Sequence, residues 1–433
     1  MPSLGGYRRS GAALVALGVV GGLAAGPAYA DDSAKSTARW TPLVVSAAAE
    51  CAVPSLDVQG VPWSLQRVLL NQLWLPDTSL PVNERKPIDG TNVKVAVIDT
   101  GVDNANPQLA GAGKVIDGGA YIKKDGKEDN GSGIGDPVGH GTKVAGIIAA
   151  SPFAQTGFVG LAPGAQIIAI RQNDAEGNGD VPHLVQAINR AVALGAGVIN
   201  ISQDVRGTDS SGKLFDGKDD LEYALKKAEA AGVVVVASSG NDGLEGETYP
   251  AAFSTVLAVG ASDRNNERAS FSQYGSFVGV AAPGVDMLST ARVHGQCVDN
   301  GTSFSSPYVA GVAALLKQKY PKWTPRQIRT RIEQTAERNG RDRNDYTGWG
   351  VVDPVKAVQS TAEPADEPTP DAAVQIDSAR IVAMPLGLAE TQQDRDRRTA
   401  LYVVAVGLLT VAGLGGGSVV LRDRRKTRSG EGG

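Results

Sequence analysis

Three residues of this 433-residue chain carry side chains that, placed together, would make a hydroxyl group nucleophilic. Asp99 stands in "AVIDTGVD", His140 in "GHGTKVAGIIAA" and Ser303 in "NGTSFSSP". A histidine that accepts the hydroxyl proton, and a carboxylate that orients this histidine, turn a serine into the attacking group of an acyl transfer. The three residues are far apart in the sequence, so this chemistry requires a fold that brings them together.

Each of the three residues also has an ordinary structural explanation. An aspartate before glycine at a strand end is commonly a turn residue, and a single histidine commonly has a structural role. Serines at a helix start are often caps, and we expect Ser305 and Ser306 to be caps or surface residues. His140 differs from His183 and His294 because it has glycine on both sides, which lets a substrate approach it closely.

The elements that must position these residues follow an α/β pattern. Between residues 93 and 340, nearly continuous apolar runs, typical of strands covered on both faces, alternate with amphipathic stretches. We predict helices over 182–195 and 218–232, and strands over 93–98, 167–170, 198–202, 233–238 and 256–260. This alternation predicts a three-layer α/β domain with a mainly parallel central sheet. Asp99 would then lie at the carboxyl ends of the strands, where open sheets bind ligands.

Ser303 lies where a helix is expected to begin, because Val312 and Leu316 follow it at helical spacing. The unpaired backbone N–H groups and the positive dipole end of that helix would stabilise a negative charge on an oxygen beside the serine. Gly301 has no side chain that could crowd a bound peptide. The position of Ser303 therefore favours a nucleophile over a simple cap.

The motifs D-T-G, H-G-T-x-V-A-G and G-T-S-x-x-S-P, in this order, resemble the three signatures of the subtilisin-like serine proteases, or subtilases. The resemblance extends over residues 61–358, the expected catalytic domain, and implies a subtilisin-like fold. It implies that Asp99, His140 and Ser303 form the catalytic triad of a serine endopeptidase.

The same resemblance assigns roles to two further residues. Asn241 in "VVVVASSGND" matches the asparagine with which the family binds the oxyanion, although S-G-N-D taken alone indicates only a turn. Ser202 in "NISQDV" matches the strand edge against which the family binds an extended substrate.

Two features depart from the family pattern. Lys143 occupies the fourth position of the motif that reads H-G-T-H in many subtilases, which leaves the triad intact. Residues 31–60 are too short for the usual propeptide that assists folding and inhibits the enzyme. We find no convincing calcium-binding loop, and we predict no required metal and no cofactor.

The two ends of the chain carry signals for export and membrane anchoring. Residues 1–30 have a basic start, an apolar stretch and a small-x-small end, which predicts a cleaved signal peptide; the alternative is an uncleaved membrane anchor. Residues 359–398 are rich in proline and acidic residues and predict an extended tether. Residues 400–421 have no charge and predict a transmembrane helix, and residues 422–433 form a basic tail. We therefore predict a single-pass protein of the cell membrane, with its catalytic domain outside and its C-terminus in the cytoplasm.

Cys51 and Cys297 are the only cysteines in the chain. In an oxidising compartment they could form a disulfide that ties residues 31–60 to the loop before Ser303, or they could remain two unpaired thiols. We predict the disulfide, and with it that the extension persists in the mature protein.

The order of these segments resembles the mycosins, the membrane-anchored subtilases of actinobacterial type VII secretion systems. This resemblance implies secretion-complex subunits as partners, besides protein or peptide substrates. The net charge of −4 is small and gives no reason to expect a nucleic-acid partner. We predict a membrane-anchored endopeptidase that acts on exported proteins. The alternative is a structural subunit that stabilises a secretion complex, with proteolysis secondary.

Overall fold

The computed structural model describes residues 42–44, 51–78, 80–124, 127–129, 131–207, 214–363, 365, 367–373 and 390–428. The chain divides into two compact units, Met1–Ala372 and Ala373–Gly433. The predicted signal peptide, residues 1–30, lies outside the described residues.

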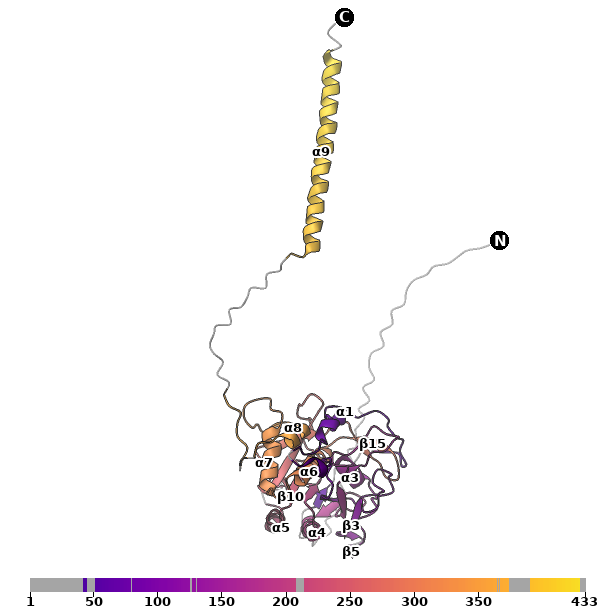
Figure 1. Cartoon of the computed structure of the whole chain (residues 1–433), viewed down its shortest axis with the longest axis vertical. Coiled ribbons are helices and arrows are strands. Elements are labelled where there is room, and N and C mark those ends of the chain that lie inside the picture. The colour runs from indigo at the N-terminus through magenta and orange to yellow at the C-terminus, as the bar shows by residue number, and fades with distance from the viewer. Residues whose placement is uncertain are drawn as a thin grey trace, which may run out of the picture. The chain divides into compact units, whose positions relative to one another are not determined.

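A seven-stranded parallel sheet forms the centre of the first unit (Figure 1), in the order β13-β12-β10-β8-β2-β6-β3. Its strands are β2 (Lys94–Asp99), β3 (Val115–Ala120), β6 (Gln166–Arg171), β8 (Val198–Ile201), β10 (Val234–Ser238), β12 (Val256–Ser262) and β13 (Val280–Pro283). All five predicted strands are present, and the α/β fold with a mainly parallel sheet is confirmed. The two strands that the apolar pattern missed, β3 and β13, lie at the edges of the sheet.

Helices cover both faces of this sheet (Figure 1). The helices on one face are α3 (His140–Ala149), α6 (Thr302–Lys319), α7 (Pro325–Thr335) and α8 (Pro354–Gln359), and those on the other are α4 (Val181–Ala193) and α5 (Lys218–Ala230). Successive residues of β2 enter different cores, because side chains alternate between the faces of a strand. Val95 and Val97 pack in the core with α3 and α6, whereas Ala96 and Ile98 pack in the core with α4 and α5. This double coverage explains the continuous apolar runs.

Helix α6 passes through the centre of its layer, and every residue from Thr302 to Leu316 is buried. The expectation that Ser305 and Ser306 are caps or surface residues is therefore wrong, since both are fully buried. The predicted helices are α4 and α5. Asp180 caps α4 by accepting a hydrogen bond from the His183 N–H at 3.0 Å, and acidic residues occupy the first turn of α5.

Shorter elements surround this framework. They are β1 (Pro42–Val44), α1 (Trp63–Gln66), α2 (Leu70–Leu73), the 3₁₀ turn η1 (Val82–Glu84), β4 (Ile122–Lys124), β5 (Lys127–Asp129), β7 (Asn178–Asp180), β9 (Val205–Arg206), β11 (Thr248–Tyr249), β14 (Met287–Thr290) and β15 (Gln296–Asp299).

The N-terminal extension is attached to the domain at two places. The predicted disulfide between Cys51 and Cys297 is present, and the Val58 N–H donates to the Gln296 side-chain oxygen at 2.8 Å. Upstream, β1 pairs antiparallel with β7, with Leu43 opposite Gly179. The extension therefore lies against the domain on both sides of residues 45–50, which are outside the described residues.

The second unit contains one long helix, α9 (Gln392–Arg428). It includes the predicted span 400–421 but begins earlier, within the segment 359–398 that the composition assigns to a tether. Among the described residues, it is the one helix long and apolar enough to cross a membrane. The start of the same segment is held on the first unit, because the Asp371 N–H donates to the Arg341 backbone oxygen at 2.8 Å.

Candidate active site

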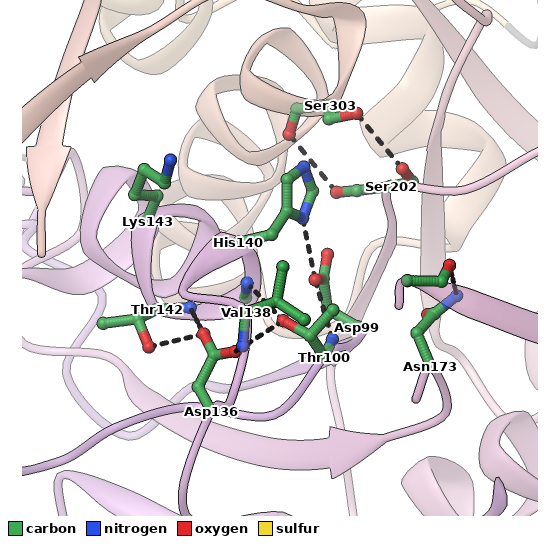
Figure 2. A network of polar contacts seen from close by, with 12 residues as sticks. Asp99, Thr100, Asp136, Val138, His140, Thr142, Lys143, Asn173, Ser202 and Ser303 are labelled. Carbon is green, nitrogen blue, oxygen red and sulfur yellow. Dashed lines mark hydrogen bonds and ion pairs between the residues drawn. The ribbon is translucent and has the colours of Figure 1, made fainter. Parts of the chain in front are cut away.

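The fold brings together two of the three expected catalytic residues in a direct hydrogen bond. Asp99 is the last residue of β2, and His140 is the first residue of α3. The Asp99 Oδ1 atom lies 2.8 Å from His140 Nδ1, and the two side chains are 0% and 1% exposed (Figure 2). Asp99 Oδ1 also accepts the Thr100 backbone N–H at 2.8 Å. The carboxylate is therefore placed to fix both the orientation and the tautomer of the imidazole.

The glycines around His140 permit this close approach. Gly139 has a φ of +91°, a left-handed conformation that turns the chain into α3. A Cβ atom on Gly141 would lie 2.1 Å from the Gly101 backbone oxygen and 3.1 Å from the Asp99 Cβ atom. The H-G motif thus lets the start of α3 pack directly on the end of β2.

Ser303 lies at the other end of the His140 ring. It is the second residue of α6, and Figure 2 shows it beyond the ring edge opposite Asp99. His140 Nε2 is buried and has no hydrogen-bond partner among the described residues, while the Ser303 hydroxyl donates to the Ser202 backbone oxygen at 3.2 Å. A change in the Ser303 side-chain rotamer would redirect the hydroxyl, and catalytic hydrogen bonds commonly tighten only when substrate is bound.

The amide oxygen of Asn241 is hydrogen-bonded to the start of α6. The Oδ1 atom accepts hydrogen bonds from the Thr302 N–H at 2.8 Å and from the Thr302 hydroxyl at 3.0 Å. This pairing identifies the amide oxygen and leaves Nδ2 directed elsewhere. Nδ2 lies 3.7 Å from the position that a Cβ atom would take on Gly301, directly before α6. The donor group of Asn241 and the start of α6 therefore border the same space.

Ser202 lies directly after β8, and its side chain contacts α6. Its side chain is buried, and its hydroxyl accepts from the Asn200 amide at 2.7 Å and donates to the Ser303 backbone oxygen at 3.3 Å. The side chain thus links the end of β8 to α6, and a role of Ser202 in substrate binding stays a prediction.

Asp136 is a supporting residue that the motifs did not single out. One of its oxygens accepts the Thr100 hydroxyl at 2.7 Å and the Gly139 N–H at 2.7 Å, and the other accepts the Thr142 N–H and hydroxyl at 2.8 and 2.7 Å (Figure 2). Burial raises the pKa of Asp136, although these hydrogen bonds oppose the rise. An aspartate four residues before a helix start is a recognisable turn signal, so the sequence contained a hint of this role.

Lys143, the departure from H-G-T-H, forms a buried ion pair. Its Nζ atom lies 2.6 Å from Asp299 Oδ2, and the side chains are 3% and 6% exposed. The same Nζ atom is 3.8 Å from the Cys51 sulfur and 5.7 Å from the centre of the Phe304 ring, which packs 5.2 Å from His140. The lysine therefore joins the first turn of α3 to the strand that carries Cys297.

The other two histidines pair with carboxylates elsewhere. His183 Nδ1 lies 2.6 Å from Asp180, and His294 Nε2 lies 3.0 Å from Asp57 of the extension. In the part of the chain that the structure describes, no group of three His, Cys, Asp or Glu side chains is placed to hold a metal ion. The polar groups around His140 suit proton transfer and binding of an oxyanion.

The sequence is similar to those of bacterial subtilisins and of an alkaline elastase. The sequence model of the Subtilase family matches residues 90–350. Alkaline elastase YaB from Bacillus sp. (strain YaB) is 38% identical over 284 residues, covering 65% of this chain and 67% of that protein. Subtilisin BL from Lederbergia lenta is 38% identical over 294 residues, covering 68% of this chain and 97% of that protein.

The fold is similar to that of solved mycosins. A structure of the MycP3 protease from the type VII (ESX-3) secretion system gives a TM-score of 0.61 at 30% identity, covering 73% of this chain and 93% of that one. A structure of MycP1 with its N-terminal propeptide removed gives 0.60 at 30% identity, covering 71% and 100%. MycP1 from Mycobacterium smegmatis gives 0.61 at 29% identity, covering 76% and 92%. These similarities agree with the subtilase resemblance drawn from the motifs and with the mycosin resemblance drawn from the order of the segments.

Proposed function

Because the chain belongs to the subtilase family and is a subtilisin-like serine endopeptidase, we propose that Asp99, His140 and Ser303 are its catalytic triad. The observation that carries this proposal is the buried 2.8 Å hydrogen bond between Asp99 and His140, with Ser303 beyond the other end of the ring. The buried His140 Nε2 atom has no hydrogen-bond partner among the described residues, and a buried polar atom of this kind is costly to the fold and typical of a functional site.

The proposed mechanism gives each of these groups a separate role. His140 Nε2 takes the proton from Ser303 Oγ as this oxygen attacks the peptide carbonyl, and then gives the proton to the leaving amine. Asp99 stabilises the positive charge on the imidazole. The Asn241 amide and the Ser303 backbone N–H donate to the oxyanion, and removal of one such donor costs about 10²–10³ in kcat. Water then releases the acyl group by the same proton transfers in reverse.

Single replacements test this assignment by their unequal effects. Ser303→Ala and His140→Ala should abolish peptide cleavage, whereas Asn241→Ala should lower kcat by about 10²–10³ and leave KM nearly unchanged. Ser305→Ala is the matched control, because Ser305 lies on the same helix and is buried. Cleavage by Ser303→Ala at the wild-type rate would remove the proposal.

We propose that the enzyme is anchored by α9 in the cytoplasmic membrane, with its catalytic domain outside. The uncharged residues 400–421 within α9 support anchoring, and the basic residues 422–428 after them favour a cytoplasmic C-terminus. Protease treatment of intact cells should digest the catalytic domain and spare an epitope tag at the C-terminus. Digestion of the tag with the domain would contradict this orientation.

The similarity to mycosins supports an association with a type VII secretion complex, in which exported proteins are the substrates. It also favours the second candidate function, a subunit that stabilises the complex while proteolysis is secondary. Ser303→Ala separates the two. Loss of secretion with an intact complex indicates that cleavage is required, and normal secretion indicates that the fold alone suffices.

A further inference from the structure

Asp204 places a carboxylate beside the segment that carries Asn241. It stands between the end of β8 and the start of β9. Its Oδ2 atom lies 3.2 Å from the position that a Cβ atom would take on Gly240, the residue before Asn241, and the Thr248 methyl carbon also lies 3.2 Å from that position. A carboxylate and a methyl group therefore occupy the space next to a residue that has no side chain.

This position is one residue away from the proposed reaction centre. If Asn241 and Ser303 hold the scissile carbonyl, the Cα atom bonded to that carbonyl carbon lies beside Gly240. Its side chain would point towards Asp204, which is partly exposed, whereas Gly240 and Thr248 beside it are buried.

The extension of the chain itself shows that an extended peptide fits along this edge. Strand β1 pairs antiparallel with β7 and also lies against β9, which begins directly after Asp204. A substrate in the same extended conformation would place alternate side chains on the side of Asp204.

The charge of Asp204 is not neutralised by a partner of its own. Among the described residues no donor forms a hydrogen bond with the Asp204 carboxylate, and the neighbouring Arg206 guanidinium pairs with Asp242. Burial and the Asp242 charge raise the pKa of Asp204 to about 7, and Arg206 opposes the rise. A positively charged ligand could therefore supply the cation that an ionised Asp204 carboxylate lacks.

We propose that Asp204 selects lysine or arginine as the substrate residue that contributes the scissile carbonyl. The ammonium or guanidinium group of that side chain donates to the partly exposed Asp204 carboxylate. The inference rests on the proposed roles of Ser303 and Asn241, because these residues define where the carbonyl lies.

Hydrolysis of a peptide series that differs only at this residue tests the inference. We expect wild type to cleave the lysine and arginine peptides with a kcat/KM at least tenfold above that of the leucine and glutamine peptides. Asp204→Asn should lose about 10²-fold on the lysine peptide and change less than threefold on the leucine peptide. Asp242→Asn removes a charge of the same sign from the exposed neighbour, and should change the lysine-to-leucine ratio less than threefold.

The possible outcomes separate the inference from the proposed function. Cleavage of all four peptides at similar rates, or an equal loss on the lysine and leucine peptides in Asp204→Asn, would overturn the inference and leave the protease intact. Labelling of Ser303 by a neutral fluorophosphonate measures whether Asp204→Asn is folded and reactive, so that a folding defect is not mistaken for lost specificity. Absence of cleavage and of labelling in wild type would remove the proposed function, and this inference with it.

Discussion

The Asp136 carboxylate accepts the Thr100 hydroxyl at 2.7 Å, and so connects the chain beside Asp99 to the turn that begins the helix of His140. Thr100 in turn accepts the Gly141 N–H at 3.0 Å. The distance between Asp99 and His140 therefore depends on a second buried carboxylate, Asp136, which hydrogen-bonds to neither side chain.

Replacement of Asp136 by asparagine should loosen this connection. The NH₂ group of the asparagine would replace one of the two oxygens that accept hydrogen bonds, and each donor left without an acceptor costs about 1–3 kcal/mol. We expect kcat/KM to fall roughly 10- to 100-fold, as a small misplacement of a catalytic group can cost that much. Asp117→Asn is the matched control, because Asp117 also accepts backbone N–H groups but lies in the edge strand β3. Equal losses in the two variants would show that Asp136 has no special link to the site.

The buried Lys143–Asp299 pair should stabilise the fold only as a pair. Lys143→Met leaves a buried carboxylate without this cation, and we expect a loss of about 3–5 kcal/mol in the free energy of unfolding. Lys143→Met combined with Asp299→Asn should recover much of that loss. Lys226→Met breaks an exposed pair with Glu222 and should cost less than about 1 kcal/mol. Denaturant unfolding of the wild type, Lys143→Met, Asp299→Asn, the double variant and Lys226→Met measures these differences, and additive losses in the double variant would contradict the coupling.

Sequence patterns predicted the strands of the central sheet better than the buried polar contacts around the candidate site. The buried strands were visible because both faces are covered, as the split of Val97 and Ile98 between two cores shows. The edge strand β3 was missed because its glycines interrupt the apolar run. The pairing of Lys143 with Asp299 spans 156 positions and has no local pattern that could reveal it. Buried polar networks depend on tertiary contacts between distant residues. The motifs therefore indicated the candidate site, and only the structure shows the hydrogen bonds and the ion pair that surround it.

Removal of the N-terminal extension should improve substrate binding. Strand β1 lies against β7 and β9, along the edge where a substrate is expected, and a site that is partly occupied has a weaker apparent affinity. We expect the protein beginning at Cys51 to have a lower KM for a peptide than the protein beginning at residue 31. A protein beginning at residue 41 keeps β1 and serves as the control. Identical KM values in all three would contradict competition by β1.

The stability of the domain should depend on the protonation of Glu333. Burial raises the pKa of Glu333 to about 7, although Arg329 and Arg343 lower it. Between the ordinary glutamate pKa and pH 7 the folded state holds a proton that the unfolded state has lost, so this group lowers stability as the pH rises through that window. Glu333→Gln should therefore raise Tm relative to wild type more at pH 8 than at pH 5. Glu176→Gln, at an exposed position, should show no such difference, and a pH-independent effect of Glu333→Gln would contradict the prediction.

We propose that His140 makes the Ser303 oxygen uniquely reactive among the hydroxyl groups of this chain. The most direct measurement is mass spectrometry of the folded protein after reaction with a fluorophosphonate, which forms a stable bond with an activated serine. We predict a single adduct, on Ser303, that disappears in His140→Ala while the protein remains folded. An adduct on another serine, or none on folded wild-type protein, would contradict the activation of Ser303 by His140.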